Sequence, residues 1–303
     1  MKIGIPRALA YHRYGVLWES FLQELDIPYI TGGETTRKTL EEGSKHAVDE
    51  SCLPLKLYMG HVSALLGRCD RIFVPRLRDM GRWDEFCVRF WGLPDTVRGT
   101  FAGARLLTYE LKSKHPLLQE HAFLRMGKLL ERGRFAAARA YRYAKMRQME
   151  ADFQRFSHER MGLRARGMKI LIAANPYLAH DPVLGGRLAR LLRDLGAVPI
   201  FPNAWNPELC KQQSKQISEN LYWGFQRETL GAVHLARGQV DGVILLTAFP
   251  CGSDCLANEL VLRRVRDVPV TQVILDEHQG EEGLRTRLES FLDMVSGRRR
   301  SDV

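Results

Sequence analysis

The chain has 303 residues, of which 45% are hydrophobic and 26% are charged. This length corresponds to about two domains, and the composition is that of a folded globular protein, not of a collagen, a coiled coil or a disordered chain. Lys and Arg number 45 against 35 Asp and Glu, which gives a net charge of +10. Most of the excess lies between residues 117 and 167, where twelve basic side chains face five acidic ones.

Compartment and redox state follow from hydropathy and cysteine content. No stretch approaches the roughly 18 uninterrupted apolar residues of a membrane span, and the N-terminus resembles a strand followed by a helix, not a signal peptide. We therefore expect a cytoplasmic protein with no membrane contact. Six cysteines are too few for a disulfide scaffold in a chain of this length. Metal binding and simple burial are the two explanations left open for them.

Short strand-like runs alternate with helical patterns in two regions of the chain. In the first region we predict strands at residues 2–6, 28–31 and 71–75, helices at 14–25 and 53–67, and a closing strand within 104–111. In the second region we predict strands at 169–173, 198–201, 243–247 and 268–275, and helices at 186–195 and from 253 or 254 to about 266. This alternation predicts an α/β fold with parallel sheets of βαβ units.

Residues 117–166 contain no strand pattern and many good helix formers, so they predict a helical connector. We therefore divide the chain into an N-terminal α/β lobe (1–112), a basic helical connector (113–167) and a C-terminal α/β lobe (168–303). The connector's charge could serve phosphate-bearing molecules, an acidic partner or nucleic acid. A solvated helix face is the simpler explanation, and no nucleic-acid motif accompanies the charge, so we do not expect a nucleic-acid partner.

Loops at the carboxyl ends of parallel strands form the ligand crevice of open sheets. Arg7 follows the first predicted strand, Arg76 follows the third and Cys251 follows the strand at 243–247. Arginine in such a loop can bind the phosphates of a ligand, and the position of Arg7 directs it at the crevice. For any single arginine, an exposed solubilising role is the simpler explanation.

Two cysteines are predicted at helix N-termini. Cys52 precedes a helix that has Pro54 in its first turn, and Cys251 precedes one that Ser253 or Asp254 can cap. The positive end of a helix dipole stabilises a thiolate, the form of cysteine that ligates metals. Three thiolates from separate loops could hold a 4Fe-4S cluster and leave one iron without a cysteine, although spacing alone favours incidental cysteines.

The remaining cysteines have different predicted roles. Cys69 and Cys210 are expected to be buried structural thiols, and Cys255 is left open as a fourth ligand, a substitute ligand or a packing residue. Several motifs of other enzymes are missing from the chain. Without H-E-x-x-H, G-x-G-x-x-G, G-x-x-x-x-G-K or G-x-S-x-G, the sequence gives little support to a zinc hydrolase, a dinucleotide enzyme, an ATPase or a serine hydrolase.

Five stretches carry a family resemblance: IGIPRAL at 3–9, DESCLP at 49–54, GLPD at 92–95, FPCGSD at 249–254, and DE at 276–277 with TRLESF at 286–291. Together they resemble the acyl-CoA dehydratase activase-related family, which is similar to the iron-sulfur subunits of 2-hydroxyacyl-CoA dehydratases such as 2-hydroxyglutaryl-CoA dehydratase. The family often has proline where this chain has Val88 and usually serine where it has Cys255.

The resemblance implies two Rossmann- or flavodoxin-like lobes around a 4Fe-4S cluster held by Cys52, Cys87 and Cys251. It implies a separate ATP-dependent activase that supplies one low-potential electron, an acyl-CoA-like small-molecule substrate, and a paralogous second subunit or a homodimer. Radical dehydration or reduction would make the chain a lyase or a reductase component, with Arg7 as a candidate for holding the phosphates of coenzyme A. The alternative is a non-catalytic partner that relays electrons or uses its metal only for structure.

Overall fold

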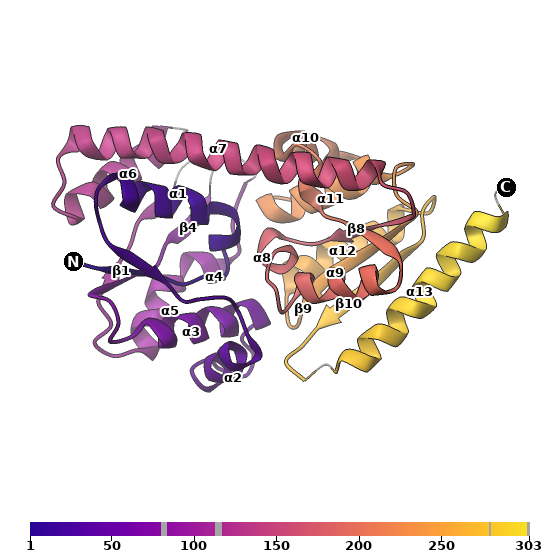
Figure 1. Ribbon diagram of the computed structural model, residues 1–303, viewed down its shortest axis with the longest axis horizontal. Helices are drawn as coiled ribbons and strands as arrows, with labels where there is room; N and C mark the ends of the chain where they lie inside the picture. Colours follow the sequence, from indigo (N-terminus) through magenta and orange to yellow (C-terminus); the bar gives the residue numbers. More distant parts are fainter. Residues whose placement is uncertain (80–83, 113–116, 279, 302–303) are drawn as a thin grey trace. The chain divides into compact units, whose positions relative to one another are not determined.

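The computed structural model describes residues 1–79, 84–112, 117–278 and 280–301. The chain forms two compact units, one of residues 1–153 with 222–224 and the other of residues 154–221 with 225–303. Each unit contains a four-stranded parallel sheet, and a long helix connects them, as Figure 1 shows. The predicted α/β fold with parallel sheets and a helical connector is confirmed. The domain boundary predicted at residue 113 lies outside the described residues.

The sheet of the first unit has the strand order β2-β1-β3-β5 and is parallel throughout. Its strands are β1 (Ile3–Ile5), β2 (Tyr29–Thr31), β3 (Arg71–Phe73) and β5 (Leu106–Leu107). Strand β1 is buried along its whole length, as expected for a central strand covered on both faces. A separate two-stranded parallel sheet pairs β4 (Arg76–Asp79) with β6 (Glu110–Lys112).

Right-handed crossovers place the helices of the first unit on both faces of its sheet, which the ribbon in Figure 1 shows. The helices are α1 (Tyr11–Glu24), α2 (Arg37–Lys45), α3 (Leu53–Leu65), α4 (Val88–Trp91), α5 (Leu93–Thr100), α6 (Leu117–Leu129) and the first part of α7 (Arg134–Arg164). Helices α1 and α6 lie on one face, and α3 and α5 lie on the other.

Aromatic rings fill the core between this sheet and helices α1 and α6. The ring centroid of Trp18 lies 4.9 Å from that of Phe73, and Phe73 stacks on Tyr109 at 5.7 Å. Phe123 of α6 meets Phe21 of α1 edge to face at 4.8 Å. All five rings are buried. Because each ring removes a large apolar area from water, this cluster contributes strongly to holding α1 and α6 on the sheet.

Helices α2 and α3 approach so closely that their backbones touch. A Cβ atom at Gly43 would lie 1.8 Å from the carbonyl oxygen of Lys56, and one at Gly60 would lie 1.9 Å from the carbonyl oxygen of Thr39. Only glycine therefore fits at either position. Since α3 begins directly after Cys52, this packing fixes the helix that follows that cysteine.

The strands of the second unit are β7 (Met168–Ala173), β8 (Ala197–Ile200), β9 (Gly242–Ala248) and β10 (Val270–Leu275), in the parallel order β10-β9-β7-β8. The central strand β9 is buried at every residue, which explains its continuous apolar sequence. Its helical segments are α8 (Pro176–Ala179), α9 (Gly185–Asp194), η1 (Pro202–Ala204), α10 (Pro207–Gln213), η2 (Ser214–Gln216), α11 (Gly224–Ala236), α12 (Gly252–Arg264) and α13 (Glu281–Ser301).

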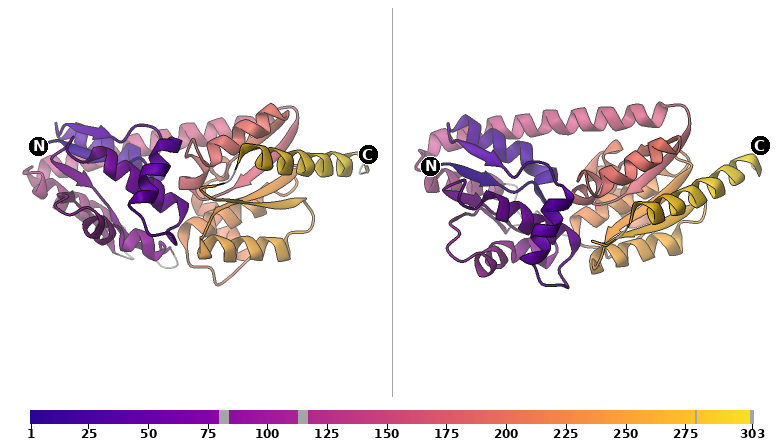
Figure 2. Two further views of the ribbon diagram at one scale, coloured as in Figure 1. Left: turned by 90° about the horizontal axis from the view of Figure 1, so that it is seen from below. Right: turned by 60° about the horizontal axis from the view of Figure 1, so that its bottom comes forward.

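Helices cover both faces of this second sheet as well. Helices α9 and α13 lie side by side on one face, as the two views of Figure 2 show, and a Cβ atom added at Gly242 of β9 would touch Phe291 and Val295 of α13. Right-handed crossovers place α11 and α12 on the opposite face. No helix in the described part of the chain combines the length and hydropathy that a membrane span requires.

The two sheets have the same topology. In each, the second strand of the unit lies outside the first, followed by the third and the fourth, which is the order of a flavodoxin-like sheet. The direction of winding reverses between β1 and β3 in the first unit and between β7 and β9 in the second. These two switch points are where loops diverge at the carboxyl ends of the strands and where ligands bind in such folds.

The last part of α7 belongs to the second unit and carries a half-buried carboxyl group. Oε2 of Glu159 accepts a hydrogen bond of 2.9 Å from the backbone N–H of Phe201, directly after β8. Burial raises the pKa of Glu159 by more than this hydrogen bond and the charges of His158 and Arg193 lower it. The group therefore binds its proton more tightly in the folded protein than in the unfolded chain.

The glycine contact between α2 and α3 predicts a large effect of a single methyl group. Gly60→Ala must push α2 away from α3, which lowers the free energy of unfolding by about 1–3 kcal/mol or more. The measurement is the urea-unfolding midpoint followed by circular dichroism. Gly99→Ala is the matched control, because Gly99 is an exposed residue of α5 with no atom near its Cβ position. The control should be neutral or slightly stabilising, and an equal effect of both substitutions would contradict the close packing.

The raised pKa of Glu159 predicts a pH-dependent stability. Below the ordinary pKa of glutamate, Glu159 is protonated in both the folded and the unfolded chain, so its ionisation does not change the free energy of unfolding. As the pH rises, the unfolded chain ionises first, and the folded protein loses stability relative to it. Glu159→Gln removes this ionisation and keeps an oxygen for the N–H of Phe201. The variant should therefore gain stability relative to the parent protein between pH 4 and pH 8 in urea titrations. A constant difference across that range would contradict the pKa shift.

Candidate functional site

A buried polar cluster occupies the switch point of the second unit. Asn175 follows β7, Thr247 lies near the end of the neighbouring strand β9, and Asp254 lies in the first turn of α12. Gln226 reaches the same point from the first turn of α11. All four side chains are at most 5% exposed. We call these four residues the Asp254 cluster.

Asp254 is the acceptor on which this cluster converges. Its Oδ1 accepts hydrogen bonds from Nδ2 of Asn175 and Nε2 of Gln226, each at 2.7 Å. Its Oδ2 accepts a bond of 3.3 Å from the hydroxyl of Thr247. None of these partners is a cation. Burial raises the pKa of Asp254 by more than its hydrogen bonds with Gln226, Cys251, Asn175 and Thr247 lower it, so this position can hold a proton in a site shielded from water.

Further hydrogen bonds fix the orientation of the Asn175 amide. Its Nδ2 also donates to the hydroxyl of Tyr177 at 2.8 Å, and its Oδ1 accepts from the hydroxyl of Thr229 at 3.4 Å. Because an ionised carboxylate only accepts hydrogen bonds, the NH2 group of Asn175 is the end of the amide that points at Asp254. The cluster is therefore a connected network from β7, α8, α11, β9 and α12, which holds the ends of these elements together.

Cys251 lies directly before α12, three residues ahead of Asp254. Its backbone is extended, and its carbonyl accepts the N–H of Cys255 at 3.0 Å as the first helical hydrogen bond. Its Sγ atom lies 3.5 Å from the hydroxyl oxygen of Ser253. The prediction that Ser253 or Asp254 caps this helix is wrong, since α12 begins at Gly252 and Cys251 itself occupies the cap position. The side chain of Asp254 is used by the buried network instead.

The Cys251 thiol is held in its protonated form. Burial and then the negative charge of Asp254 raise its pKa, and they outweigh the Ser253 hydroxyl and the Asp254 backbone N–H, which favour the thiolate. The helix N-terminus alone therefore does not produce the thiolate that the sequence predicts. A metal that binds the sulfur displaces the proton through its own charge. The thiol also hydrogen-bonds to the side chain of Asp254, which further favours its protonated form.

Cys52 has the equivalent position at the start of α3 in the first unit. Its φ of −64° and ψ of 148° are extended, and its carbonyl accepts the N–H groups of Leu55 and Lys56 at 2.9 and 3.1 Å. Pro54 is in the first turn, where its missing N–H costs little. The predicted placement of Cys52 at a helix N-terminus is confirmed, and its side chain is half-buried.

Cys87 also lies directly before a helix, the four-residue α4. Arg76 holds the other end of α4. Its Nη1 donates to the carbonyl of Trp91 at 2.9 Å, and its guanidinium binds the carboxylate of Asp95 through two hydrogen bonds of 2.8 and 2.9 Å. Arg76 was a candidate for phosphate binding, but the structure uses it to join β4 to α4 and α5.

The three predicted ligand cysteines thus share one local geometry. Each is half-buried, each has extended backbone angles at the position before a helix, and none makes a side-chain capping hydrogen bond of normal geometry. Cys52 and Cys87 belong to the first unit and Cys251 to the second. Among the described residues, no group of three or more His, Cys, Asp or Glu side chains is arranged to hold a metal ion. That these three sulfurs bind one cluster stays a prediction.

The remaining cysteines differ from these three. Cys210 is 1% exposed within α10, which confirms its predicted burial. Cys69 is only half-buried, so its predicted burial is wrong. It precedes β3, its thiol donates to the carbonyl of Leu65 at 3.4 Å, and partial burial raises its pKa. Cys255 is exposed in the first turn of α12, so its side chain does not pack in the core. All six cysteines are thiols and not disulfides.

Arg7 lies two residues beyond β1, at the carboxyl end of the strand as predicted. Its side chain is half-buried, and its guanidinium carbon lies 5.6 Å from the ring centroid of Tyr11. The hydroxyl of Tyr11 donates in turn to Glu19, so the ring is fixed beneath the cation. A role for Arg7 in binding phosphate stays a prediction.

Asn175, Gln226 and Thr247 are site residues that the sequence did not reveal. Asn175 follows a predicted strand, and a polar residue at a strand end is a signal that could have found it. Gln226 gives no such signal, because nothing in the sequence distinguishes it from the other polar residues of α11. Only the folded chain shows that it points at Asp254.

Comparison with known proteins gives one family. Residues 2–204, about two thirds of the chain, match the model of a family described as "CoA enzyme activase uncharacterised domain (DUF2229)". The matched span contains Cys52, Cys87 and Asn175, whereas Cys251 and Asp254 lie beyond it. No curated protein matches the chain.

The Asp254 cluster predicts a difference between two substitutions of its central residue. Asp254→Ala removes one of the two acceptors from each buried amide and leaves Asn175 with the hydroxyl of Tyr177 and Gln226 with that of Ser253. The free energy of unfolding should therefore fall by about 1–3 kcal/mol for each N–H left unsatisfied. Asp254→Asn keeps a side-chain oxygen as an acceptor, so it should lower the free energy of unfolding by less than Asp254→Ala does. Urea unfolding monitored by circular dichroism measures both, with the exposed Asp194→Ala of α9 as the control. Equal losses for the Ala and Asn variants would contradict the role of Asp254 as the shared acceptor.

Proposed function

Because the chain belongs to the CoA enzyme activase uncharacterised domain family, whose name associates it with CoA enzyme activase systems, we propose that it is the iron-sulfur protein on which such an activase acts. In this proposal the chain receives a low-potential electron from a separate ATP-dependent activase. It then serves in the dehydration or reduction of an acyl-CoA-like substrate, in the manner of a 2-hydroxyacyl-CoA dehydratase component. The observation that carries the proposal is the shared geometry of Cys52, Cys87 and Cys251.

The donor set fits a 4Fe-4S cluster. Thiolates are the ligands that such clusters take, and a ligand set of three cysteines without histidine or carboxylate suits iron-sulfur chemistry better than catalytic zinc or a hard cation. When bound, a cluster of this kind stores and passes on one electron, and three cysteines leave one iron open to another ligand. We propose Cys52, Cys87 and Cys251 as its protein ligands.

Each of the three cysteines lies at the N-terminus of a helix, which affects the charge that its sulfur can carry. At the start of α12 the backbone N–H of Asp254 favours the thiolate of Cys251, and Cys52 and Cys87 lie at the same end of α3 and α4. Such donors stabilise negative charge on thiolate and sulfide and raise the reduction potential of a cluster. The position before a helix therefore suits a ligand of a cluster that must accept an electron.

Each ligand is positioned by a different support. Glycine-mediated packing of α2 on α3 fixes Cys52, and the ion pair of Arg76 with Asp95 fixes the short helix after Cys87. The buried carboxyl of Asp254 fixes the start of α12 and with it Cys251. None of these supports depends on a bound group, so the three loops are preorganised before any cluster is loaded.

Anaerobic purification tests the proposal. We expect a brown protein with about four iron atoms and four sulfide ions per chain, as the formula of the cluster requires. Cys52→Ala, Cys87→Ala and Cys251→Ala should each lose most of the iron and the visible absorption. Cys69→Ala is the matched control and should keep both, because Cys69 lies before β3, at the end of the first sheet opposite to the carboxyl ends of its strands.

Several outcomes would overturn the proposal. A colourless protein with one tightly bound zinc ion excludes the cluster, and iron content that survives all three substitutions excludes these ligands.

Spectra of the reduced protein with and without an acyl-CoA thioester separate a catalytic component from an electron relay. A spectral change supports the proposed function, whereas unchanged spectra favour the non-catalytic alternative. Cys255→Ala with unchanged iron content but altered spectra would identify Cys255 as a fourth ligand.

A further inference from the structure

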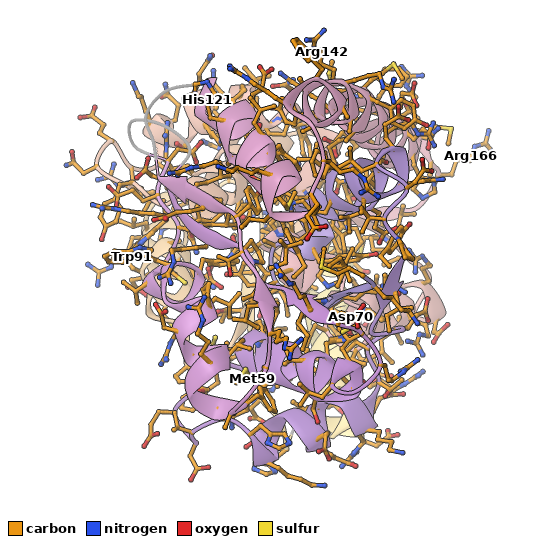
Figure 3. The ribbon with its side chains drawn as sticks, turned by 90° about the vertical axis from the view of Figure 1, so that its left-hand side faces the viewer. Met59, Asp70, Trp91, His121, Arg142 and Arg166 are labelled. Atoms are coloured by element: carbon orange, nitrogen blue, oxygen red, sulfur yellow. The ribbon has the colours of Figure 1, made fainter. Side chains whose placement is uncertain are left out.

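A cavity of about 760 Å³ lies entirely within the first unit, and none of the three predicted ligand cysteines lines it. It is bounded by helix α6, by the turn that joins α6 to α7 and by β6. Figure 3 looks at the side of this unit that carries His121, one of the lining residues. The residues that line it are Glu110, His121, Ala122, Leu124, Arg125, Lys128, Arg132 and Arg134.

The lining is strongly cationic. Its cations are Arg125, Lys128, Arg132 and Arg134, and Glu110 supplies the one carboxylate among the described lining residues. In the part of the chain that the structure describes, Arg125, Lys128 and Arg134 have no acidic partner within ion-pair distance. Four cations around one concave surface repel one another, and this arrangement is unfavourable unless counterions or an anionic ligand neutralise it.

One of these cations is held in place by the fold. Nε of Arg132 donates a hydrogen bond of 3.0 Å to the carbonyl of Leu25, at the end of α1. This bond uses one of the five N–H donors of the guanidinium and leaves the others available. A preorganised arginine of this kind loses little conformational entropy when it binds a phosphate, which it can grip through two parallel hydrogen bonds.

The cavity also offers an apolar wall. Ala122 and Leu124 line it next to the cations, and the ring of His121 stands beside them on α6. Its volume falls within the range of roughly 300–1,000 Å³ that is usual for small-molecule sites, which is larger than an inorganic anion needs. A ligand that fills it must therefore combine several negative charges with a flat or apolar part.

We propose that this cavity binds an organic diphosphate of nucleotide size, with its phosphates on the four cations and its uncharged part against the apolar wall. Two sources supply that chemistry, a free nucleoside diphosphate and the adenosine diphosphate portion of coenzyme A. The site is complete within the first unit and needs no metal cluster, so it stands or falls independently of the proposed function.

The neighbouring helix α7 provides a control surface of the same charge. Arg142 and Lys145 lie beside an exposed groove formed with Met146, Met149, Glu150 and Phe153, and none of these lines the cavity. Replacing Arg142 and Lys145 changes the net charge as much as replacing Arg125 and Lys128 does. The two pairs therefore separate a built anion site from a general attraction of the basic connector for anions.

Isothermal titration calorimetry on the full chain tests the proposal. The probes are ADP, coenzyme A, inorganic pyrophosphate and adenosine. We expect ADP or coenzyme A to bind more tightly than pyrophosphate and much more tightly than adenosine. R125E/K128E should weaken that binding by more than about tenfold, because two charge-assisted contacts are lost, whereas R142E/K145E should change it less than about threefold. The milder R125Q/K128Q keeps the test valid if the double charge reversal disturbs folding.

The outcomes that overturn the proposal are distinct. Equal weakening by both charge-reversal pairs would show a general electrostatic attraction, and adenosine binding as tightly as ADP would exclude a phosphate site. Pyrophosphate binding as tightly as ADP would exclude the organic part of the ligand. Tighter binding of duplex DNA, lost in R142E/K145E and steeply dependent on salt, would assign the charge to a nucleic-acid surface. Cys52→Ala should bind ADP normally, so failure of the cluster proposal would leave this result unchanged.

Discussion

The buried carboxyl of Asp254 joins the strand ends and helix starts of the second unit at its switch point. Two amides and a hydroxyl from β7, α11 and β9 converge on it, and no cation neutralises it. In a medium of low dielectric constant, such a group is costly to leave unsatisfied and also costly to ionise. Both costs favour a single arrangement of the surrounding loops. The position of Cys251, three residues earlier on the same turn, depends on that arrangement.

This dependence explains why a polar network is found where a hydrophobic core would be cheaper. Apolar side chains at the same positions could be more stabilising, but they would tolerate several packings of the loop that follows β9. A network in which every side chain has hydrogen-bond partners at fixed positions restricts the direction of each side chain in it. We infer that the second unit uses the network for accuracy at the Cys251 loop, in the same way that close glycine packing and the Arg76 ion pair fix the loops of Cys52 and Cys87.

The basic segment of the chain divides into surfaces with different properties. Helix α6 and the following turn place their cations around a cavity, whereas the cations of α7 are spread along an exposed helix with methionine and phenylalanine side chains between them. The same composition therefore gives a concave anion site in one place and a solvated, partly apolar helix face in another. The net charge of the segment does not distinguish these two surfaces.

The amino-acid sequence determined the local features of this protein. Alternating strand and helix patterns gave the parallel α/β fold, and Pro54 together with the apolar run after it placed Cys52 at a helix start, because these signals act within a few residues. The turn after β9 could be located in the same way, but its capping residue could not, since Asp254 is an equally good cap or network acceptor until the positions of Asn175 and Gln226 are known.

Tertiary structure decided the rest, for the common reason that the partners are distant in the chain. Arg76 pairs with Asp95, Arg132 bonds the carbonyl of Leu25, and Gln226 bonds Asp254. No periodic pattern in the sequence predicts any of these contacts. The pKa of Cys251 shows the same limit. A helix N-terminus is visible in sequence and favours the thiolate, but burial and the charge of Asp254 exist only in the folded unit, and they outweigh it.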